Sequence, residues 1–327
     1  MEADELAPNI KEYKQIFYDM AEEFKWTDKK VLMLAASVYV MHDQRFSPRQ
    51  FKELCEYIKK ESGLFSPLKS DLRFTVAALL DVHGEAPKEK YDKLHHVYDK
   101  LVEHGFKKGN FTYIAALIIL TGERLQAEDD QMNRALTIYK EMKNEHPFLT
   151  AKEDYPLAFL LSKTDGEVKD VVNRVEFFYK KLSQDVFRKG NDLQFLSHIL
   201  SLDEEHENER LVERAGHIYD QMKHLSIKPK TVHYPEIGLL SLFNEGTKEL
   251  ETIKAVKKDL DQSKHFKWNK DINFKMAVNL SVSHRLKDSS IAATGLFTTI
   301  ESIMQAQQAA MMAGMVGAVA ASNTTNT

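Results

Sequence analysis

The residues with the most obvious chemical potential form a run of histidines and carboxylates in the second half of the chain. The run consists of His198, Asp203, Glu204, Glu205, His206 and Glu207. Imidazole and carboxylate groups bind divalent metal ions, so one hypothesis is a metal-dependent hydrolase that uses this region. The spacing fits no known ligand pattern, and the alternative interpretation, which we favour, is a solvated loop between two helices.

Two other groups carry reactive side chains with a simpler structural interpretation. His95 and His96 are adjacent, and neighbouring residues on a helix point about 100° apart, so they cannot chelate one metal together and we expect both at the surface. Cys55 lies on an apolar stripe of helical spacing with Leu54 and Ile58. We interpret it as a small apolar filler, because a nucleophilic thiol needs a nearby base and the sequence identifies none.

Composition and missing motifs argue against several classes of enzyme. The chain has 327 residues and one cysteine, which excludes an intramolecular disulfide and a thiolate metal cluster and fits a reducing compartment. It contains no glycine-rich phosphate loop, Gly-x-Ser-x-Gly, His-Glu-x-x-His or EF-hand spacing. The sequence therefore assigns no catalytic residue, metal ligand or cofactor, and it favours a protein that is not an enzyme.

Positive charges recur in the short segments that connect predicted helices. They are Lys25, Lys29, Lys30, Lys69, Arg73, Lys107, Lys108, Lys152, Arg188, Lys189, Lys228, Lys230, Lys267 and Lys270. If equivalent segments align along one edge, these cations form a stripe that the net charge of -4 conceals, and such a stripe would bind RNA or another polyanion in a salt-dependent way. Acidic residues in or next to the same segments oppose this hypothesis: Asp28, Asp71, Glu153, Asp154, Asp192 and Asp271.

An internal repeat of about forty residues positions these segments. Tyrosines recur 39 to 41 residues apart as anchors, and Val256 takes this place in a seventh unit: Tyr18, Tyr57, Tyr98, Tyr139, Tyr179 and Tyr219. Six to ten residues later follows an aromatic residue or isoleucine: Phe24, Phe65, Phe106, Phe148, Phe187, Ile227 and Phe266. A further position lies fifteen to eighteen residues after the anchor: Met33, Phe74, Tyr113, Tyr155, Phe195, Tyr234 and Phe274.

Each unit is predicted to form an antiparallel pair of helices. The first helix, called helix A, is amphipathic, as residues 135–142 illustrate, and the second, helix B, is nearly apolar, as in residues 113–120. A single pair cannot bury helix B, whereas stacked pairs can. With only 13 Gly and 8 Pro, the chain is expected to be all-α, an α-solenoid of about seven helix hairpins. The alternative is an irregular helical bundle in which the tyrosine spacing is accidental.

The predicted start of each helix B carries residues that can cap free backbone N–H groups. They are Thr27, Ser66, Asn110, Thr150 with Glu153, Asn191 and Thr231. This favours a helix start directly after each linker.

The repeat suggests three regions along the chain. Residues 1–285 are expected to form the helical-repeat array, residues 286–313 a C-terminal capping helix, and residues 314–327 a flexible tail. Residues 309–321 lack polar side chains, but thirteen residues are fewer than the roughly 20 that span a bilayer. We expect this stretch to cap the last hairpin, with docking onto another protein as the alternative, and we expect a cytoplasmic protein because the N-terminus lacks the features of an export signal.

Three stretches resemble a bacterial family of uncharacterised proteins catalogued as domain of unknown function 4003. They are residues 111–117 (FTYIAAL), 187–197 (FRKGNDLQFLS) and 305–311 (QAQQAAM). The resemblance covers most of the chain. It implies a helical cytosolic protein and supplies no activity, catalytic residue or ligand.

A weaker likeness links the chain to tetratricopeptide and pentatricopeptide helical repeats. It is clearest at residues 219–222 (YDQM), residues 227–229 (IKP) and Tyr234. The period of about 40 departs from the tetratricopeptide value of about 34, so no residue-by-residue RNA code can be carried over. The main functional hypothesis is a non-enzymatic scaffold that binds a protein or peptide partner. RNA or polyanion binding and a metal-dependent hydrolase are the alternatives.

Overall fold

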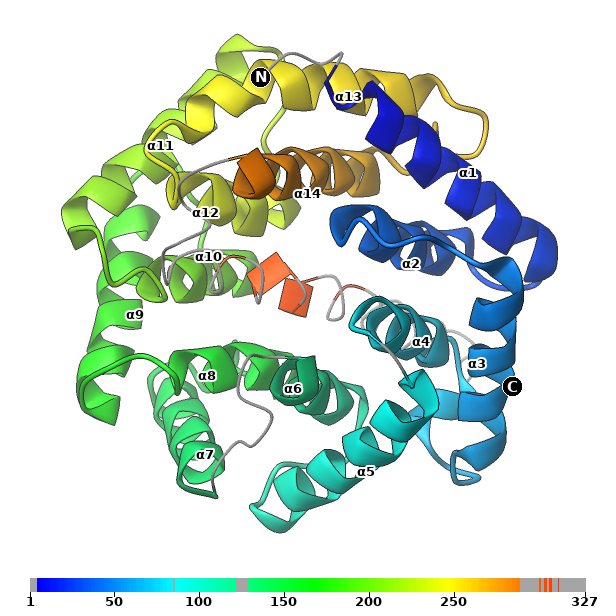
Figure 1. The fold of residues 1–327 in the computed structure, drawn as a ribbon. Coiled ribbons are helices and arrows are strands. Elements are labelled where there is room, and N and C mark those ends of the chain that lie inside the picture. Colours follow the sequence, from blue (N-terminus) through cyan, green and yellow to red (C-terminus); the bar gives the residue numbers. More distant parts are fainter. Residues whose placement is uncertain are drawn as a thin grey trace, which may run out of the picture. The chain divides into compact units, whose positions relative to one another are not determined.

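The computed structural model describes residues 5–84, 86–121 and 129–288, together with residues 300, 303, 304, 306, 307 and 311 (Figure 1). These residues form fourteen α-helices and four short 3-10 helices and contain no strand. The expectation of an all-α fold is therefore confirmed. The predicted tail at residues 314–327 and most of residues 286–313 lie outside the described residues.

The α-helices alternate along the chain between the predicted A and B segments. The odd-numbered helices are α1 (Ala7–Glu23), α3 (Pro48–Glu61), α5 (Pro87–Glu103), α7 (Asp129–Glu145), α9 (Val168–Ser183), α11 (Asn208–His224) and α13 (Leu250–Gln262). The even-numbered helices are α2 (Lys29–Met41), α4 (Leu72–Val82), α6 (Asn110–Thr121), α8 (Tyr155–Leu161), α10 (Asn191–Ser201), α12 (Tyr234–Ser241) and α14 (Lys270–Asp288). The 3-10 helices are η1 (Pro67–Lys69), η2 (Lys152–Asp154), η3 (Thr231–His233) and η4 (Gly246–Glu249).

The even-numbered helices form the buried layer that their composition predicts. Every residue of α8 and α12 is buried, as are residues 31–41 of α2 and residues 112–120 of α6. The odd-numbered helices bury one face only; α3, for example, buries Phe51, Leu54, Cys55 and Ile58 and exposes its charged residues. The amphipathic odd-numbered helices thus bury one face, whereas the nearly apolar even-numbered helices are buried on almost all faces.

The chain divides into two compact units. The N-terminal unit comprises Asn9–Asn133 with Met304–Thr327, and the C-terminal unit comprises Arg134–Ile303 with Met1–Pro8. The division falls inside α7, which the sequence treats as one helix of one repeat.

Within each unit, a helix packs against its own partner and against the equivalent helix of the next pair (Figure 1). In the C-terminal unit, α10 contacts α9 and α12, and α12 contacts α11 and α14. In the N-terminal unit, α4 contacts α2, α3 and α6, and α5 packs on α6. Gly238 of α12 shows how close the B helices come, because a Cβ atom there would lie 3.2 Å from a side-chain carbon of Ile199 on α10.

The helix starts use some of the predicted caps and replace others. Ser66 accepts a hydrogen bond from Leu68 N (3.2 Å) and so caps the 3-10 helix η1 rather than α4, and Asp28 rather than Thr27 caps α2 by accepting from Lys30 N (2.8 Å). The predicted capping box of Thr150 and Glu153 is wrong. Asp154 instead accepts from Ala151 N (2.9 Å).

Thr150 is a buried linker residue that connects α7 to α10. Its hydroxyl donates to Met142 O (3.2 Å) and accepts a hydrogen bond from Gln194 Nε2 of α10 (2.7 Å). A buried hydroxyl must satisfy its own hydrogen-bonding capacity, and a partner 44 positions along the chain can supply this only once the fold has formed.

Three arginines, each forty residues from the next, tie helix A to the end of its own helix B. They are Arg134 on α7, Arg174 on α9 and Arg214 on α11. Their guanidinium groups donate to backbone carbonyls at or beyond the last turn of the partner helix: Ser162, Thr164 and Gly166 for Arg134, Ser201 and Asp203 for Arg174, and Ser241 for Arg214. The last carbonyls of a helix have no partner within it, so these side chains satisfy a need that every apolar helix B creates.

Anchor tyrosines fasten the linkers in a similar way. The hydroxyl of Tyr98 accepts a hydrogen bond from Gly109 N, and that of Tyr179 accepts one from Gly190 N, both at 3.3 Å. Gly109 and Gly190 have φ angles of 153° and 146°, a backbone conformation that glycine adopts without a steric penalty. The eleven-residue spacing from tyrosine to glycine is therefore a structural rule of these two repeats.

We expect loss of one of these arginine contacts to weaken the fold measurably. Arg174→Met keeps much of the side-chain volume but leaves the carbonyls of Ser201 and Asp203 without their charged donor. The free energy of unfolding should fall by about 2 kcal/mol, because hydrogen bonds to charged groups contribute about 1.5–3 kcal/mol each. Urea unfolding followed by circular dichroism measures this loss.

Lys180→Met is the matched control, since Lys180 is exposed on the same helix. It should change stability by less than about 0.5 kcal/mol. Equal stability of the two variants would show that the arginine contacts contribute nothing to the fold.

Candidate functional site

The predicted run of histidines and carboxylates does not form one site, because its members make separate local contacts. His198 lies on α10 with no exposed surface, whereas Asp203 organises the turn that follows. Asp203 Oδ1 accepts hydrogen bonds from the backbone N–H groups of Glu205 and His206 (both 2.9 Å), and its Oδ2 lies 2.8 Å from His206 Nδ1. No group of three or more His, Cys, Asp or Glu residues within the described part of the chain could hold a metal ion.

His198 belongs instead to a buried polar pair with Asp154. Its Nδ1 lies 3.9 Å from Asp154 Oδ1, and neither ring nitrogen has a hydrogen-bond partner among the described residues. Desolvation by burial, together with nearby His146, lowers the pKa of His198 to about 3, and desolvation by burial raises the pKa of Asp154 to about 7. The imidazole is therefore uncharged at neutral pH, as a core side chain requires.

The two pKa shifts predict opposite effects of pH on stability. Below its ordinary pKa near 6.5, an unfolded histidine binds a proton that buried His198 does not, so His198 lowers stability as the pH falls from about 6.5 to about 4. Asp154 binds its proton more tightly in the folded state and therefore raises stability over the same range. Relative to the wild type, His198→Leu should gain unfolding free energy at pH 5 compared with pH 7, and Asp154→Asn should lose it.

Each effect has an upper limit of about 1.4 kcal/mol per pH unit, the value for one proton. Urea unfolding at both pH values measures it, and His96→Leu, which removes an exposed histidine of α5, should match the wild type. Shifts of the same sign in both variants would contradict the assignment of an uncharged His198 beside a protonated Asp154.

The adjacent histidines and the cysteine have structural roles. His95 is half-buried and its Nε2 lies 2.7 Å from the hydroxyl of Tyr91, so the expectation that both histidines lie at the surface is wrong for His95; His96 is exposed. Cys55 is buried, and desolvation raises the pKa of its thiol. A raised pKa is the opposite of what activates a thiolate, which supports its interpretation as an apolar filler.

Three successive linkers lie next to one another in the N-terminal unit. We call residues 24–28, 62–71 and 104–109 the N-terminal linker edge. The Phe24 ring is 4.8 Å from that of Phe74 at the start of α4, and Ser66 Oγ is 3.4 Å from the Tyr113 hydroxyl at the start of α6. Each linker therefore touches the next hairpin in order.

Four linkers are joined in the same way in the C-terminal unit. We call residues 146–154, 184–190, 225–233 and 263–269 the C-terminal linker edge. Gln194 of α10, which follows the second linker, donates to Thr150 of the first linker (2.7 Å). Tyr234 of α12, which follows the third linker, accepts from Arg188 N of the second linker (3.0 Å).

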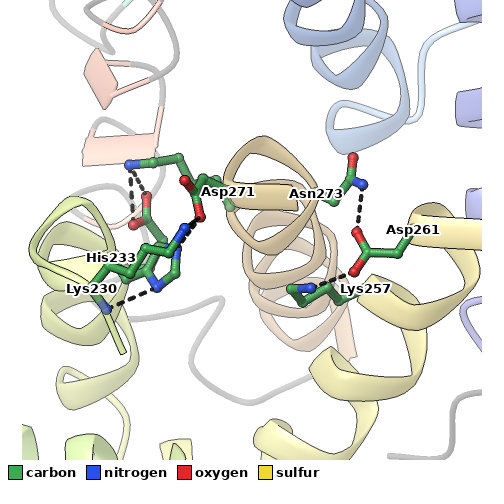
Figure 2. A network of polar contacts seen from close by, with 8 residues as sticks. Lys230, His233, Lys257, Asp261, Asp271 and Asn273 are labelled. Atoms are coloured by element: carbon green, nitrogen blue, oxygen red, sulfur yellow. Dashed lines mark hydrogen bonds and ion pairs between the residues drawn. The ribbon is translucent and has the colours of Figure 1, made fainter. Parts of the chain in front are cut away.

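A polar network joins the last two linkers of this edge (Figure 2). His233 Nδ1 accepts from Lys230 N (3.3 Å), and its Nε2 lies 3.2 Å from Asp271 Oδ1 on α14, which also pairs with Lys230 Nζ (2.6 Å). Burial lowers the pKa of His233 to about 4, so the ring is neutral and donates through Nε2. The network holds the start of α14 against η3, while on its other side Asn273 donates to Asp261 (2.8 Å), which pairs with Lys257.

The linkers carry the most exposed large apolar side chains of the described residues. Their exposed fractions are 100% for Trp26, 81% for Leu64, 94% for Phe65, 99% for Phe148 and 82% for Trp268. By their place in the repeat, Phe65 and Phe148 are expected to be equivalent to Phe106 and Phe187, which are 2% and 3% exposed, so the expected equivalence fails at these positions. The sequence signals which residues recur but not which of them face water.

Two pockets occupy corresponding places in the two units. In the C-terminal unit, a pocket of about 460 Å³ lies between two linkers and is lined by Arg188, Tyr219, Lys223, Ser226, Ile227, Lys228 and Pro229. In the N-terminal unit, one of about 450 Å³ is lined by Gly63, Leu64, Phe65, Ser66, Pro67, Tyr98, Lys108, Gly109 and Tyr113. Each contains an anchor tyrosine, and neither lining includes a carboxylate; the C-terminal pocket has three cationic side chains and the N-terminal pocket has one, Lys108.

A further pocket of about 560 Å³ lies at the opposite helix ends of the N-terminal unit. Its acidic residues have partners: Asp81 accepts a hydrogen bond from the Tyr39 hydroxyl (2.7 Å), and Glu53 pairs with Arg49 (2.9 Å). These contacts satisfy the charges from within the protein, so we assign no ligand to this pocket.

Comparison with known proteins identifies relatives without an assigned activity. Residues 16–309 match the model of a family described as "Protein of unknown function (DUF4003)". The chain is 37% identical over 324 residues to "Uncharacterized protein YeaA" of Bacillus subtilis (strain 168), and the alignment covers 98% of each chain. No solved structure matches the chain.

Proposed function

The chain belongs to the DUF4003 family, and we propose that it is a non-enzymatic helical-repeat scaffold that binds an acidic segment of a protein or peptide partner. The pocket of the C-terminal linker edge is the observation that carries this proposal. It combines an aromatic side chain, cations and apolar residues between two neighbouring linkers.

The repeat architecture is part of the proposal. Packing of each hairpin on the next within both units supports an α-solenoid over residues 1–285. Ile300 and Ile303 are fully buried, which supports a capping role for residues 286–313. We assign the scaffold to the cytoplasm because its single cysteine fits a reducing compartment.

Burial restricts where a partner can bind. Most described residues of the B helices are buried, and α8 and α12 are buried throughout, so these helices present little surface to a partner. The proposed scaffold must therefore bind its partner through its linkers or through the outer faces of its A helices. The linkers are better suited, because they carry the pockets and the exposed aromatic side chains.

The chemistry of the C-terminal pocket selects the partner. Arg188 and Lys228 are exposed, and Tyr219 is half-buried between them in the lining. Arginine and tyrosine are enriched at protein interfaces, where planar guanidinium groups bind carboxylates and rings supply contact area. An Asp or Glu side chain of a partner would meet cations in this pocket, whose apolar lining is formed by Ile227 and Pro229.

The two alternatives receive less support here. Polyanion binding would need an unbroken cationic edge, but the carboxylates of Glu153, Asp192 and Asp271 interrupt the cations of the C-terminal unit. A metal-dependent hydrolase would need a ligand cluster, and the described residues provide none of three or more ligands.

A charge-reversed variant tests the proposal. The chain and the double variant Arg188→Glu/Lys228→Glu are each used for affinity purification from the native cell, followed by quantification of co-eluting proteins. A specific partner should be recovered with the wild type and fall at least about tenfold with the variant, because two charge-assisted contacts become repulsive.

Lys254→Glu/Lys258→Glu is the matched control, since both lysines are exposed on α13 of the same unit and the charge change is equal. This control should retain the partner. An equal loss of the partner in both variants would indicate general electrostatic attraction. Equal recovery of the partner with both variants would show that it binds outside the C-terminal pocket.

A further inference from the structure

The N-terminal linker edge exposes three large apolar side chains at successive turns. Trp26 stands in the first linker, and Leu64 and Phe65 stand in the second, with exposed fractions from 81% to 100%. Side chains of this size are normally covered, and a cluster of them at one edge marks a surface that meets an apolar partner. The linkers that carry them are neighbours, as the contacts of Phe24 and Ser66 with the following hairpins show.

Cations lie on the same linkers as these apolar side chains, and Lys108 lines a pocket together with Leu64 and Phe65. Lys25, Lys30 and Lys108 are exposed and form no ion pair with any described residue. On these three linkers and the first turns of the helices that follow, the Lys and Arg residues outnumber the two acidic ones, Asp28 and Asp71: Lys25, Lys29, Lys30, Lys69, Arg73, Lys107 and Lys108. The edge is therefore apolar at its tips and positive around them, in contrast to the interrupted charges of the C-terminal edge.

This combination matches the interface of an anionic lipid bilayer. Tryptophan favours the headgroup region of a membrane, and phenylalanine and leucine enter the hydrocarbon boundary. Lysines near the surface are attracted to anionic lipids. A single-stranded RNA would use Trp26 and Phe65 as stacking surfaces but would gain nothing from Leu64, which has no ring. The aliphatic side chain beside the two aromatic ones thus favours lipid over RNA.

We propose that the N-terminal linker edge binds the surface of an anionic membrane, with Trp26, Leu64 and Phe65 inserted at the headgroup level and the linker lysines on anionic lipid headgroups. Attachment is peripheral. No helix of the described residues is long and apolar enough to cross a bilayer, and the proposed contact needs none. This surface is separate from the C-terminal pocket assigned to a partner segment, so either assignment can fail without the other.

The tryptophans provide a direct test, because the chain has only two. In Trp268→Phe, Trp26 is the single indole. This variant is mixed with vesicles of phosphatidylcholine alone or with added phosphatidylglycerol, and both co-sedimentation and Trp26 emission are recorded. Binding and a shift of the emission to shorter wavelength are expected only with the anionic vesicles, and partitioning should fall with added salt.

Two sets of variants on this background separate the apolar and cationic contributions. Leu64→Ser/Phe65→Ser should weaken partitioning at least about tenfold, and each of Lys25→Gln, Lys30→Gln and Lys108→Gln should weaken it about fivefold. Phe148→Ser, which removes an equally exposed ring from the other unit, should leave it unchanged. Circular dichroism confirms that every variant is folded.

Three results would overturn the proposal. They are no co-sedimentation with anionic vesicles, binding with an unshifted Trp26 emission, and an equal loss in Phe148→Ser and Leu64→Ser/Phe65→Ser. Tight binding of polyuridylate that quenches Trp26, without vesicle binding, would instead assign the edge to RNA.

Discussion

The need to keep the B helices out of water determines the rest of this structure. Segments such as residues 112–120 offer no polar face, so a lone hairpin would leave half of its helix B exposed. Contacts of α10 with α9 and α12 in the C-terminal unit, and of α4 with α2, α3 and α6 in the N-terminal unit, remove that surface from solvent. Close approach at Gly238 shows that the packing uses small residues where the helices cross.

Burying a helix also buries the unpaired backbone N–H and C=O groups at its ends. Side chains from neighbouring elements form hydrogen bonds with these groups. Arg134, Arg174 and Arg214 supply donors to the terminal carbonyls of B helices, and Tyr98 and Tyr179 accept from linker glycines. The anchor tyrosines therefore have two functions: the ring packs within the hairpin and the hydroxyl fixes the turn. Because the turns are fixed from within, their other side chains are available to face outward.

The sequence predicts the elements of this fold far better than their surfaces. Helical spacing and the forty-residue tyrosine period locate the α-helices of the described residues, because both depend on local patterns of side chains. The exposure of Phe65 and Phe148 could not be predicted, since a phenylalanine in a short linker turns inward or outward according to backbone geometry. His198 shows the same limit: its sequence neighbours suggest a metal site, but α10 directs it into the core while Asp203 ends in the turn.

The arginine contacts have a consequence for how such a chain can change in length. Each arginine binds carbonyls of its own hairpin, and only packing and a few side-chain contacts cross from one hairpin to the next. Within the C-terminal unit, a tandem duplication or deletion spanning one period between equivalent points of α9 and α11 would leave every guanidinium group with its own acceptors. Growth by whole hairpins is therefore open to this architecture during evolution, whereas an insertion of any other length within a hairpin would separate donor from acceptor.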